Sequence, residues 1–259
     1  MDKDKALKVS IITVVRNNKE TVKNAIDSVL GQTYKNIEYI VIDGGSTDGT
    51  VDVIEKYSDK ISIFLSEPDE GLYDGLNKGI KLATGDIIAI LHSDDVFYDK
   101  CVVSDMVDKM HVTGSEFCFS DLVIVDNKKI LRYYMANYYK RWLFRIGWLP
   151  PHPTCFMKRS LFHEFGLYST KYKGAGDFDF LVRIFYGRDI QWAYLNRITV
   201  KMQYGGISNS GWRSKVSNAQ EISKILKNNN VFSLTIFQLL RYLIRLVEMV
   251  IKPNNYRDN

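Results

Sequence analysis

The sequence predicts an α/β protein built on a mostly parallel, doubly wound sheet. Four apolar runs rich in isoleucine and valine are typical of strands: residues 9–15, 37–43, 61–67 and 86–92. These runs are continuous rather than alternating, as expected for strands whose two faces are both covered by helices. Amphipathic segments lie between them, and regular alternation of strand and helix favours a parallel sheet.

Three helices are expected within this first part of the chain. The segment 19–32 places its apolar side chains on one face and ends near Gly31, which suits a helix C-cap. Thr47 or Asp48 can cap a second helix. Residues 73–83 supply the third.

The pattern changes after residue 95. Residues 99–111 read as a helix, 117–135 as a hairpin with its turn at Asp126 and Asn127, and 176–187 as a further helix. No internal repeat, low-complexity tract or linker is visible in the sequence. We therefore expect one domain with a variable second half.

The bulk composition indicates a globular protein of a reducing compartment. The 259 residues carry a formal net charge of +5 but lack the dense lysine and arginine runs of nucleic-acid-binding proteins, so no nucleic-acid partner is expected. The three cysteines form no CxxC pair, which argues against a zinc site and a disulfide framework. The start, MDKDKALK, has no signal-peptide core, and no stretch reaches the ~20 apolar residues of a membrane span. The sequence thus predicts a cytoplasmic protein.

The segment 231–252 predicts an amphipathic helix with a narrow polar stripe. Its polar residues recur at spacings of three and four: Gln238, Arg241, Arg245, Glu248 and Lys252. Such a helix either packs on the domain or in a homodimer, or lies on a membrane with its basic residues toward the headgroups. The aromatic and basic segment 138–148 favours the membrane alternative.

Polar side chains follow each of the four predicted strands. In open α/β sheets, ligands bind beyond the carboxyl ends of the strands. Three of these strand ends carry carboxylates, at Asp43, at Glu67 and Asp69, and at Asp94 and Asp95. Turns alone would be served equally well by Gly, Asn or Ser, so the dominance of aspartate indicates a binding site.

The segment DGGSTDGT (43–50) is ambiguous when it is taken alone. Its glycines allow a ligand to approach the backbone in front of a helix, and Asp43 suits a hydrogen bond to a ribose or a base. However, it matches neither the GxGxxG dinucleotide fingerprint nor the GxxxxGK[ST] phosphate loop. A structural turn is the better explanation of this segment by itself.

The adjacent carboxylates Asp94 and Asp95 allow two interpretations. They could cap the helix expected from residue 99. Alternatively, they could hold Mg²⁺ or Mn²⁺, which binds one or two carboxylates together with substrate phosphates. A dication at this position would neutralise charge on a departing nucleotide diphosphate.

From residue 8 to residue 209 the chain resembles the family 2 glycosyltransferases, and in particular bacterial enzymes of surface-polysaccharide, O-antigen and colanic-acid assembly. Each matching segment alone is a weak signal, whereas the set in this order is specific. The segments are VSIITVVRNNKETVKNAIDSVLGQTYKNIEYIVIDGGSTDGT, SEPDEGLYDGLNKGIKLATGDIIAILHSDD, PPHPTCFMKRSLF, AGDFDFLVRIF and KMQYGGISN.

The resemblance implies the GT-A fold of nucleotide-diphospho-sugar transferases. It implies a glycosyltransferase domain over residues 1–210, followed by a helical C-terminal extension over 211–259. Within the domain, we expect a nucleotide-binding half at 8–98 and an acceptor half at 99–210.

The resemblance also implies roles for residues on the donor side. The nucleotide base and ribose are expected at Thr13, Val14 and Asp43. Further residues of the nucleotide cleft are expected on the following loop and helix: Asp69, Tyr73, Asn77 and Lys78.

His92-Ser93-Asp94 falls on the DxD motif of the family, with His92 in place of the usual first aspartate. Asp94 and Asp95 would then bind the Mg²⁺ or Mn²⁺ ion and the ribose-phosphate. The role of His92 stays open between a metal ligand, a substrate contact and the mark of a site that has lost its function.

On the acceptor side, the resemblance places the catalytic base at Asp177, with Asp179 as the less favoured candidate. Inverting transfer needs the acceptor hydroxyl to be deprotonated as it attacks the anomeric carbon, and one carboxylate suffices as that base. A diphosphate leaving group needs no general acid, unlike the hydrolysis of a bond between two sugars. Because the two aspartates point to different sides of a helix, only one should reach the acceptor.

The resemblance implies a hexose donor linked to UDP, GDP or dTDP and a glycan acceptor on a polyprenyl diphosphate carrier. Such an acceptor would bring the protein to the inner face of the plasma membrane. The alternative is a catalytically inactive nucleotide-binding scaffold at the membrane, which the altered position His92 favours.

Three further features, namely His152, Lys201 and the loop 204–209, each allow two interpretations. His152, in PPHPT, is either a structural histidine or an active-site residue. Lys201 and the glycine-containing loop 204–209 either close over phosphates or form an ordinary turn at a strand end.

Overall fold

The computed structural model describes residues 6–126, 129–205, 211–234, 237–238, 240–251 and 253. Asn127, the loop residues 206–209 and Lys252, on which parts of the expectations above depend, lie outside these residues.

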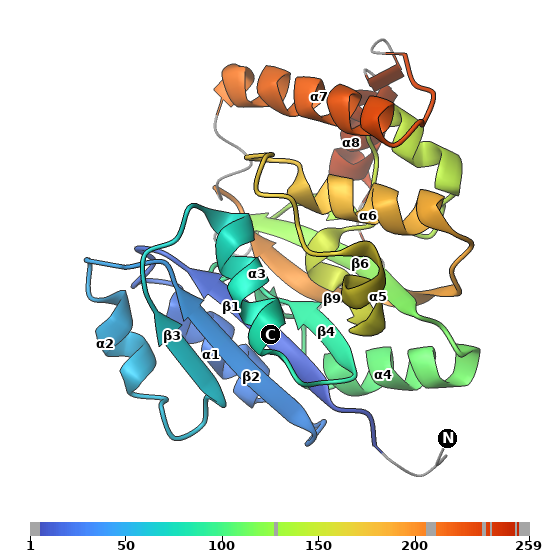
Figure 1. Cartoon of the computed structure of the whole chain (residues 1–259). Coiled ribbons are helices and arrows are strands. Elements are labelled where there is room, and N and C mark those ends of the chain that lie inside the picture. Colours follow the sequence, from blue (N-terminus) through green and yellow to red (C-terminus); the bar gives the residue numbers. More distant parts are fainter. Residues whose placement is uncertain are drawn as a thin grey trace.

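The first half of the fold is a parallel sheet with helices on both faces (Figure 1). Its strand order is β3-β2-β1-β4, and every pairing among these strands is parallel. The strands are β1 (Val9–Val15), β2 (Ile37–Asp43), β3 (Ile63–Ser66) and β4 (Ile87–Ile90). The intervening helices are α1 (Val22–Leu30), α2 (Thr50–Glu55) and α3 (Leu72–Leu82).

Two apolar cores lie on opposite sides of this sheet. Ile12 and Val14 of β1 pack in one core with α3, whereas Ile11 and Val15 pack in the other with α1. This split follows from the two-residue alternation of side chains along a strand. It explains why the strand sequences are apolar throughout. The predicted α/β fold class and the C-cap at Gly31 are therefore confirmed.

The second half continues the same sheet with mixed pairing, in the order β4-β8-β6-β9-β5. β6 and β9 are parallel, whereas the β4–β8, β6–β8 and β5–β9 pairs are antiparallel, and β7 forms a hairpin with β6. The strands are β5 (Val96–Phe97), β6 (Phe117–Asp126), β7 (Lys129–Tyr134), β8 (Phe156–Lys158) and β9 (Trp192–Gln203). The expectation of a mostly parallel sheet thus holds for the first half only.

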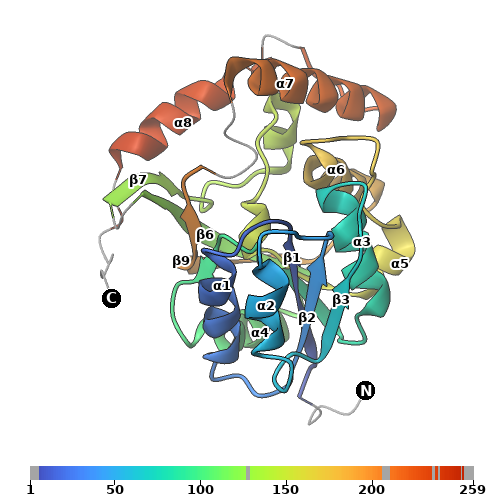
Figure 2. The same ribbon diagram turned by 90° about the vertical axis from the view of Figure 1, so that its left-hand side faces the viewer.

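Helices and short 3₁₀ turns connect these strands. The α-helices are α4 (Val102–Thr113), α5 (Ser160–Phe165) and α6 (Gly176–Gly187), and the 3₁₀ turns are η1 (Arg141–Ile146) and η2 (His152–Thr154). The extension forms α7 (Gly211–Asn228) and α8 (Leu240–Val250). Figure 2 shows α7 and α8 lying above α6, β6 and β7.

Helix α3 approaches strand β1 very closely, and two glycines allow this. A Cβ atom on Gly75 would lie 2.7 Å from Cγ1 of Val14, and one on Gly79 would lie 2.5 Å from Cγ2 of Ile12. Glycines four residues apart lie on one face of a helix, and the two strand residues share one face of the sheet. This contact fixes the distance between α3 and the sheet.

The polar stripe of the C-terminal helix faces the protein. Gln238, Arg241 and Glu248 are buried, and Glu248 forms an ion pair with Arg132 of β7. The expectation that the basic residues point outward is wrong for Arg241. The helix is also shorter than the predicted 231–252, because residues 231–234 are not helical.

We predict that Gly79→Ala destabilises the fold by about 1–3 kcal/mol, because the added methyl group collides with Ile12. In a helix without this contact the same change would stabilise by up to about 1 kcal/mol, so the sign is diagnostic. Urea denaturation measures the effect, with Lys81→Ala on the exposed side of α3 as the matched control. A more stable G79A protein would contradict the close packing.

Candidate active site

The loops that follow β1 and β2 are joined at the carboxyl edge of the parallel sheet. The N–H of Asn17 donates to Oγ of Ser46 (2.8 Å), and Oδ1 of Asn17 accepts from the N–H of Thr47 (2.8 Å). Asn17 has a φ of 49°, which asparagine tolerates better than most residues. The loops after β1 and β2 are therefore held together by hydrogen bonds at this edge of the sheet.

Asp43 is fully buried at the end of β2 and organises its own turn. Its carboxylate accepts hydrogen bonds from the N–H groups of Gly45 (3.1 Å) and Ser46 (3.0 Å) and from the hydroxyls of Ser46 and Ser66. Asp43 thus shapes the turn, as the purely structural explanation of DGGSTDGT requires. Its predicted contact with the nucleotide remains a prediction.

Thr13 and Val14 lie beneath this edge rather than on an open surface. Thr13 is fully buried, and its hydroxyl accepts a hydrogen bond from the hydroxyl of Tyr39 (3.2 Å). Val14 is 7% exposed and faces Gly75 of α3. Both side chains have structural partners, and their predicted role in binding the base is untested.

Asp69 sits between the β2 turn and helix α3. A Cβ atom on Gly44 would lie 2.3 Å from Oδ2 of Asp69, so Gly44 leaves the space that this carboxylate fills. Its Oδ1 accepts from the N–H of Gly71 (3.0 Å), and the Arg16 guanidinium lies 4.0 Å away. The structure therefore places Asp69 against Gly44 of the β2 turn, and its predicted role in the nucleotide cleft remains a prediction.

Asn77 and Lys78 of α3 are held by protein groups. Asn77 makes two hydrogen bonds with the backbone of Tyr168, donating to its C=O (2.9 Å) and accepting from its N–H (3.0 Å). Lys78 lies 2.8 Å from the Glu67 carboxylate and from the Pro68 carbonyl, and Glu67 raises its pKa. In this structure both residues hold loops in place.

The loop after β4 is anchored to the start of α1. The amide of Asn18 donates to Oγ of Ser93 (2.9 Å), and the hydroxyl of Thr21 donates to the Ser93 carbonyl (2.9 Å). Helix α4 begins only at Val102, and Asp99 bonds the N–H of Cys101 just before it. The interpretation of Asp94 and Asp95 as a helix N-cap is therefore wrong.

Asp95 is fully buried, and neither of its oxygens makes a hydrogen bond of normal geometry within the described chain. Burial and the neighbouring Asp94 raise its pKa well above the usual range, and the N–H of Gln203 offsets this only in part. Buried carboxylates are normally paired or bound to a metal.

A hard dication fits this turn. Mg²⁺ and Mn²⁺ take oxygen ligands and are typically held by one or two carboxylates together with phosphates and water. Asp94, which is partly exposed, and the unsatisfied Asp95 supply two such groups. Among the described residues, no cluster of three or more His, Cys, Asp or Glu ligands occurs.

His92 and His152 form a stacked pair next to this turn, with ring centroids 6.2 Å apart. Nε2 of His152 lies 2.8 Å from the hydroxyl of Tyr168. Burial lowers the pKa of both rings, that of His152 to about 3, so both are neutral at physiological pH. A neutral imidazole can accept a hydrogen bond or bind a metal but cannot supply positive charge.

Asp177 lies in the first turn of α6, where its carboxylate is partly exposed. Oδ1 accepts from the N–H of Phe178 (2.8 Å) and from the hydroxyl of Tyr73 (3.2 Å). Burial raises the pKa of Asp177, and these two donors moderate the rise. The geometry suits a carboxylate that accepts a proton.

Asp179 has a different partner. Nε of Arg183 donates to its Oδ2 (3.0 Å), and the same guanidinium donates to the carbonyls of Phe165 and Leu167. Asp179 thus holds Arg183 in place within the acceptor half. This supports its position as the less favoured base.

Lys201 lies on β9 directly opposite Val96, the residue after Asp95. Its ammonium group lies 4.9 Å from the centroid of the Tyr98 ring. The pairing therefore brings Lys201 near the acidic turn, whereas loop residues 206–209 lie outside the described part.

Two supports of Asp177 carry no clear signal in the sequence. A Cβ atom on Gly176 would lie 2.8–2.9 Å from the ring of Tyr73, so this glycine lets the tyrosine lie against the start of α6. Glu221 of α7 accepts from the N–H groups of Lys173 (3.1 Å) and Gly174 (3.1 Å). The extension therefore fixes the loop that leads to Asp177.

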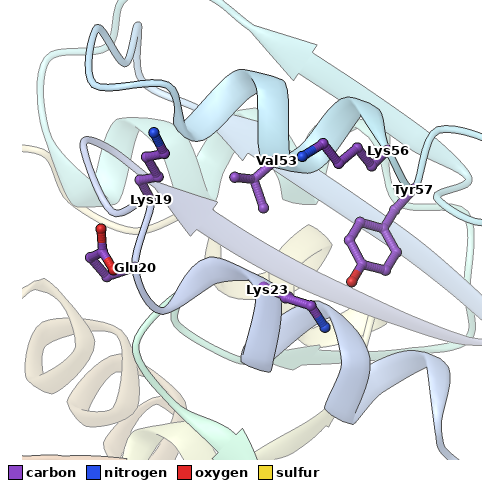
Figure 3. A pocket seen from close by; sticks show the side chains of 6 residues that line it. All are labelled: Lys19, Glu20, Lys23, Val53, Lys56 and Tyr57. Carbon is purple, nitrogen blue, oxygen red and sulfur yellow. The ribbon is translucent and has the colours of Figure 1, made fainter.

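An open hollow of about 500 Å³ lies elsewhere, between α1 and α2 (Figure 3). No residue predicted for the site lines it. One of its lining lysines, Lys23, is paired with Asp27. Its lining is Lys19, Glu20, Lys23, Val53, Lys56 and Tyr57.

Comparison with known proteins identifies the family of this chain. Residues 10–166 match the family model described as Glycosyl transferase family 2. A PGL/p-HBAD biosynthesis glycosyltransferase of Mycobacterium tuberculosis is 29% identical over 208 residues, which cover 78% of this chain and 79% of that protein. Another M. tuberculosis glycosyltransferase is 33% identical over 186 residues, covering 68% of each chain.

Solved structures share the fold at low sequence identity. S. aureus TarS in complex with UDP-GlcNAc superposes with a TM-score of 0.71 at 18% identity, covering 92% of this chain and 72% of that one. The mannosyltransferase PcManGT from Pyrobaculum calidifontis, in complex with GDP-Man and Mn²⁺, gives 0.66 at 16% identity, covering 95% and 71%. This chain spans 66% of the TarS chain solved with UDP.

We predict that Asp95→Asn stabilises the metal-free protein at neutral pH by about 1–3 kcal/mol, because it removes a buried, unpaired charge. The raised folded-state pKa means that the native protein binds more protons than the unfolded chain above about pH 4. The folding free energy that Asp95 costs therefore grows as the pH rises from its pKa in the unfolded chain toward its higher pKa in the folded protein. Urea denaturation from pH 4 to 8 measures this.

The matched control is Asp94→Asn, whose side chain keeps access to solvent and should give a smaller effect. A D95N protein that is less stable than the wild type across this pH range would show that the carboxylate has a stabilising partner.

Proposed function

This chain belongs to the family 2 glycosyltransferases, and we propose that it transfers a hexose from a nucleotide-diphosphate sugar to an acceptor hydroxyl with inversion at the anomeric carbon. The observation that carries the proposal is the position of Asp177. It is a partly exposed carboxylate with a raised pKa, held by Tyr73 and the start of α6.

Asp177 is proposed as the general base. As the acceptor oxygen attacks the anomeric carbon, a C–O bond forms, the bond to the diphosphate breaks, and the hydroxyl proton passes to Oδ of Asp177. The raised pKa makes this carboxylate a stronger base than an ordinary aspartate. The remaining catalysis comes from holding donor and acceptor in line.

Asp94 and Asp95 are the residues proposed to hold Mg²⁺ or Mn²⁺. Such an ion, when bound, neutralises charge on the departing diphosphate. The unsatisfied oxygens of Asp95 support this assignment. The neutral His92 beside them is proposed to contact the donor or the ion rather than to carry charge.

The donor nucleotide is proposed to lie across the β1 and β2 loops, near Asp43 and Asp69. UDP, GDP and dTDP sugars are all candidates, and the structural neighbours were solved with UDP-GlcNAc and with GDP-Man. The hydrogen bond between Asn17 and Ser46 supports a preformed donor site.

For the acceptor, we propose a glycan on a polyprenyl diphosphate carrier, in the assembly of a bacterial surface polysaccharide at the inner face of the plasma membrane. The support is the family resemblance and the apolar C-terminal segment. Among the described residues, none of the helices is long and apolar enough to cross a membrane.

The second candidate function is an inactive nucleotide-binding scaffold. The observation that favours it is His92, a neutral ring at the first position of the DxD motif. Titration with UDP and Mn²⁺ alongside a sugar-release assay separates the two functions. Binding without any turnover would support the scaffold.

We predict that Asp177→Asn lowers transfer by about 10²–10⁴-fold and leaves binding of UDP with Mn²⁺ unchanged, because the base acts in chemistry and not in donor binding. Release of nucleotide from a panel of UDP-, GDP- and dTDP-sugars measures turnover, and calorimetry measures binding. Asp59→Asn, an exposed aspartate before β3, is the matched control. Undiminished turnover in D177N would overturn the assignment.

We predict that Tyr73→Phe moves the acid limb of the kcat/KM profile to higher pH. The hydroxyl of Tyr73 stabilises the carboxylate form of Asp177, so its loss raises the pKa of the base further. The rate on the plateau above the limb should change little. A pH–rate series measures this, with Tyr34→Phe, whose hydroxyl bonds the Leu7 carbonyl, as the control. A limb that stays in place or moves to lower pH would contradict the contact.

A further inference from the structure

The C-terminal segment exposes a run of large apolar side chains, here named the C-terminal apolar face. Val250 is 80% exposed and Phe232 65%, far beyond the isolated exposed apolar residues that any surface has. The face comprises Phe232, Leu234, Phe237, Leu240, Leu243, Leu246, Val247, Met249, Val250 and Ile251.

The opposite side of this segment is fixed to the protein by polar contacts. Glu248 is 3% exposed, pairs with Arg132 of β7, and accepts a hydrogen bond from Tyr138 (3.0 Å). The amide of Gln238 donates to Oγ of Ser223 on α7 (2.6 Å). A helix that packs on a soluble domain normally buries its apolar side, whereas this segment buries polar side chains and exposes apolar ones.

These contacts determine which way α8 faces. Figure 2 shows α8 above β7 at the periphery of the described chain, and on its other side Leu243 and Leu246 are 59% and 58% exposed. Turning the helix over to bury its leucines would leave Arg132 without the Glu248 carboxylate in a mostly buried position. Breaking a buried ion pair in this way is strongly unfavourable.

We propose that the C-terminal apolar face docks on an anionic lipid bilayer. The charge around the face argues for lipid rather than for a second copy of the chain. Residues 222–259 contain six Lys and Arg and two Asp and Glu; of these, Arg241 is buried and Glu248 pairs with Arg132. A two-fold dimer would bring these like charges together, whereas anionic headgroups complement them.

Exposed basic side chains lie beside the apolar residues. Lys224 and Lys227 are exposed on α7, which leads directly into the face. Arg145 of η1 is also exposed, and its carbonyl accepts a hydrogen bond from Ser233, between Phe232 and Leu234. Apolar side chains bordered by basic ones are the arrangement of helices that lie in the interface of a membrane.

The docked orientation would bring the acceptor half to the lipid. Helix α8 packs on β7, and α7 holds the loop before Asp177 through Glu221. The docking itself does not require sugar transfer. The use of a lipid-linked acceptor that it would serve rests on the proposed function.

The test measures binding to vesicles of phosphatidylcholine containing about one third phosphatidylglycerol, by co-sedimentation of the full chain. Leu243→Glu with Leu246→Glu, both exposed on α8, should weaken binding about tenfold or more. The matched control places the same two glutamates at Leu82 and Val112, which are exposed apolar residues outside the face. It should bind like the wild type.

A second variant tests the charges without touching the apolar residues. Arg145→Gln with Lys227→Gln should weaken binding to the phosphatidylglycerol vesicles by about tenfold or more and leave weak binding to pure phosphatidylcholine unchanged. Donor hydrolysis in the absence of vesicles reports folding and the proposed chemistry separately. It should be equal in all variants.

Three outcomes would overturn the proposal. The wild type could fail to bind the vesicles, or L243E/L246E could bind as tightly as the wild type. Light scattering could instead show a wild-type dimer that L243E/L246E converts to a monomer, without vesicle binding, which would assign the face to a second copy. Loss of donor hydrolysis in the wild type, with vesicle binding intact, would count against the proposed function alone.

Discussion

The backbone of helix α3 packs directly against side chains of strand β1, and the arrangement of the site depends on that contact. Gly75 and Gly79 remove the side chains that would hold the helix away from Ile12 and Val14. The same helix then presents Tyr73 to Asp177 and Asn77 to Tyr168. A displacement of α3 by the width of a methyl group would loosen each of these contacts, because all of them lie on one rigid element.

Two carboxylates of the site, Asp177 and Asp95, are both desolvated but differ in their hydrogen-bond partners. Burial raises the pKa of Asp177, and hydrogen bonds from Phe178 and Tyr73 oppose this rise. Asp95 is buried without adequate partners, which favours its neutral form until a cation or another donor approaches. Ionised Asp95 therefore lowers the stability of the fold, and the free energy of binding a cation there can offset this cost.

The sequence was sufficient for the parts of the fold that depend on periodicity. The apolar strands, α1 with its C-cap at Gly31, and the hairpin of β6 and β7 follow from local patterns. The resemblance placed Asp94, Asp95 and Asp177 at candidate positions, and the structure gives each a plausible environment.

The antiparallel insertion of β8 could not be foreseen, because three residues carry too little periodicity. Likewise, the support of the Asp177 loop by Glu221 joins residues almost 50 positions apart, and no local pattern encodes it. The polar stripe of α8 was visible in the sequence, but its direction was not, because that depends on Arg132 in a distant strand.

The two hydrogen bonds between Asn77 and the backbone of Tyr168 have a consequence for the modularity of this fold. They join the nucleotide-binding half to the acceptor half across 91 residues, and they satisfy a backbone donor and an acceptor that are both buried. An acceptor half transplanted from a relative would have to present its backbone to Asn77 in the same geometry, or leave two buried polar groups unpaired. Exchange of the second half of the fold between relatives is therefore constrained by one amide side chain. Changes confined to loops that leave residue 168 in place avoid that constraint.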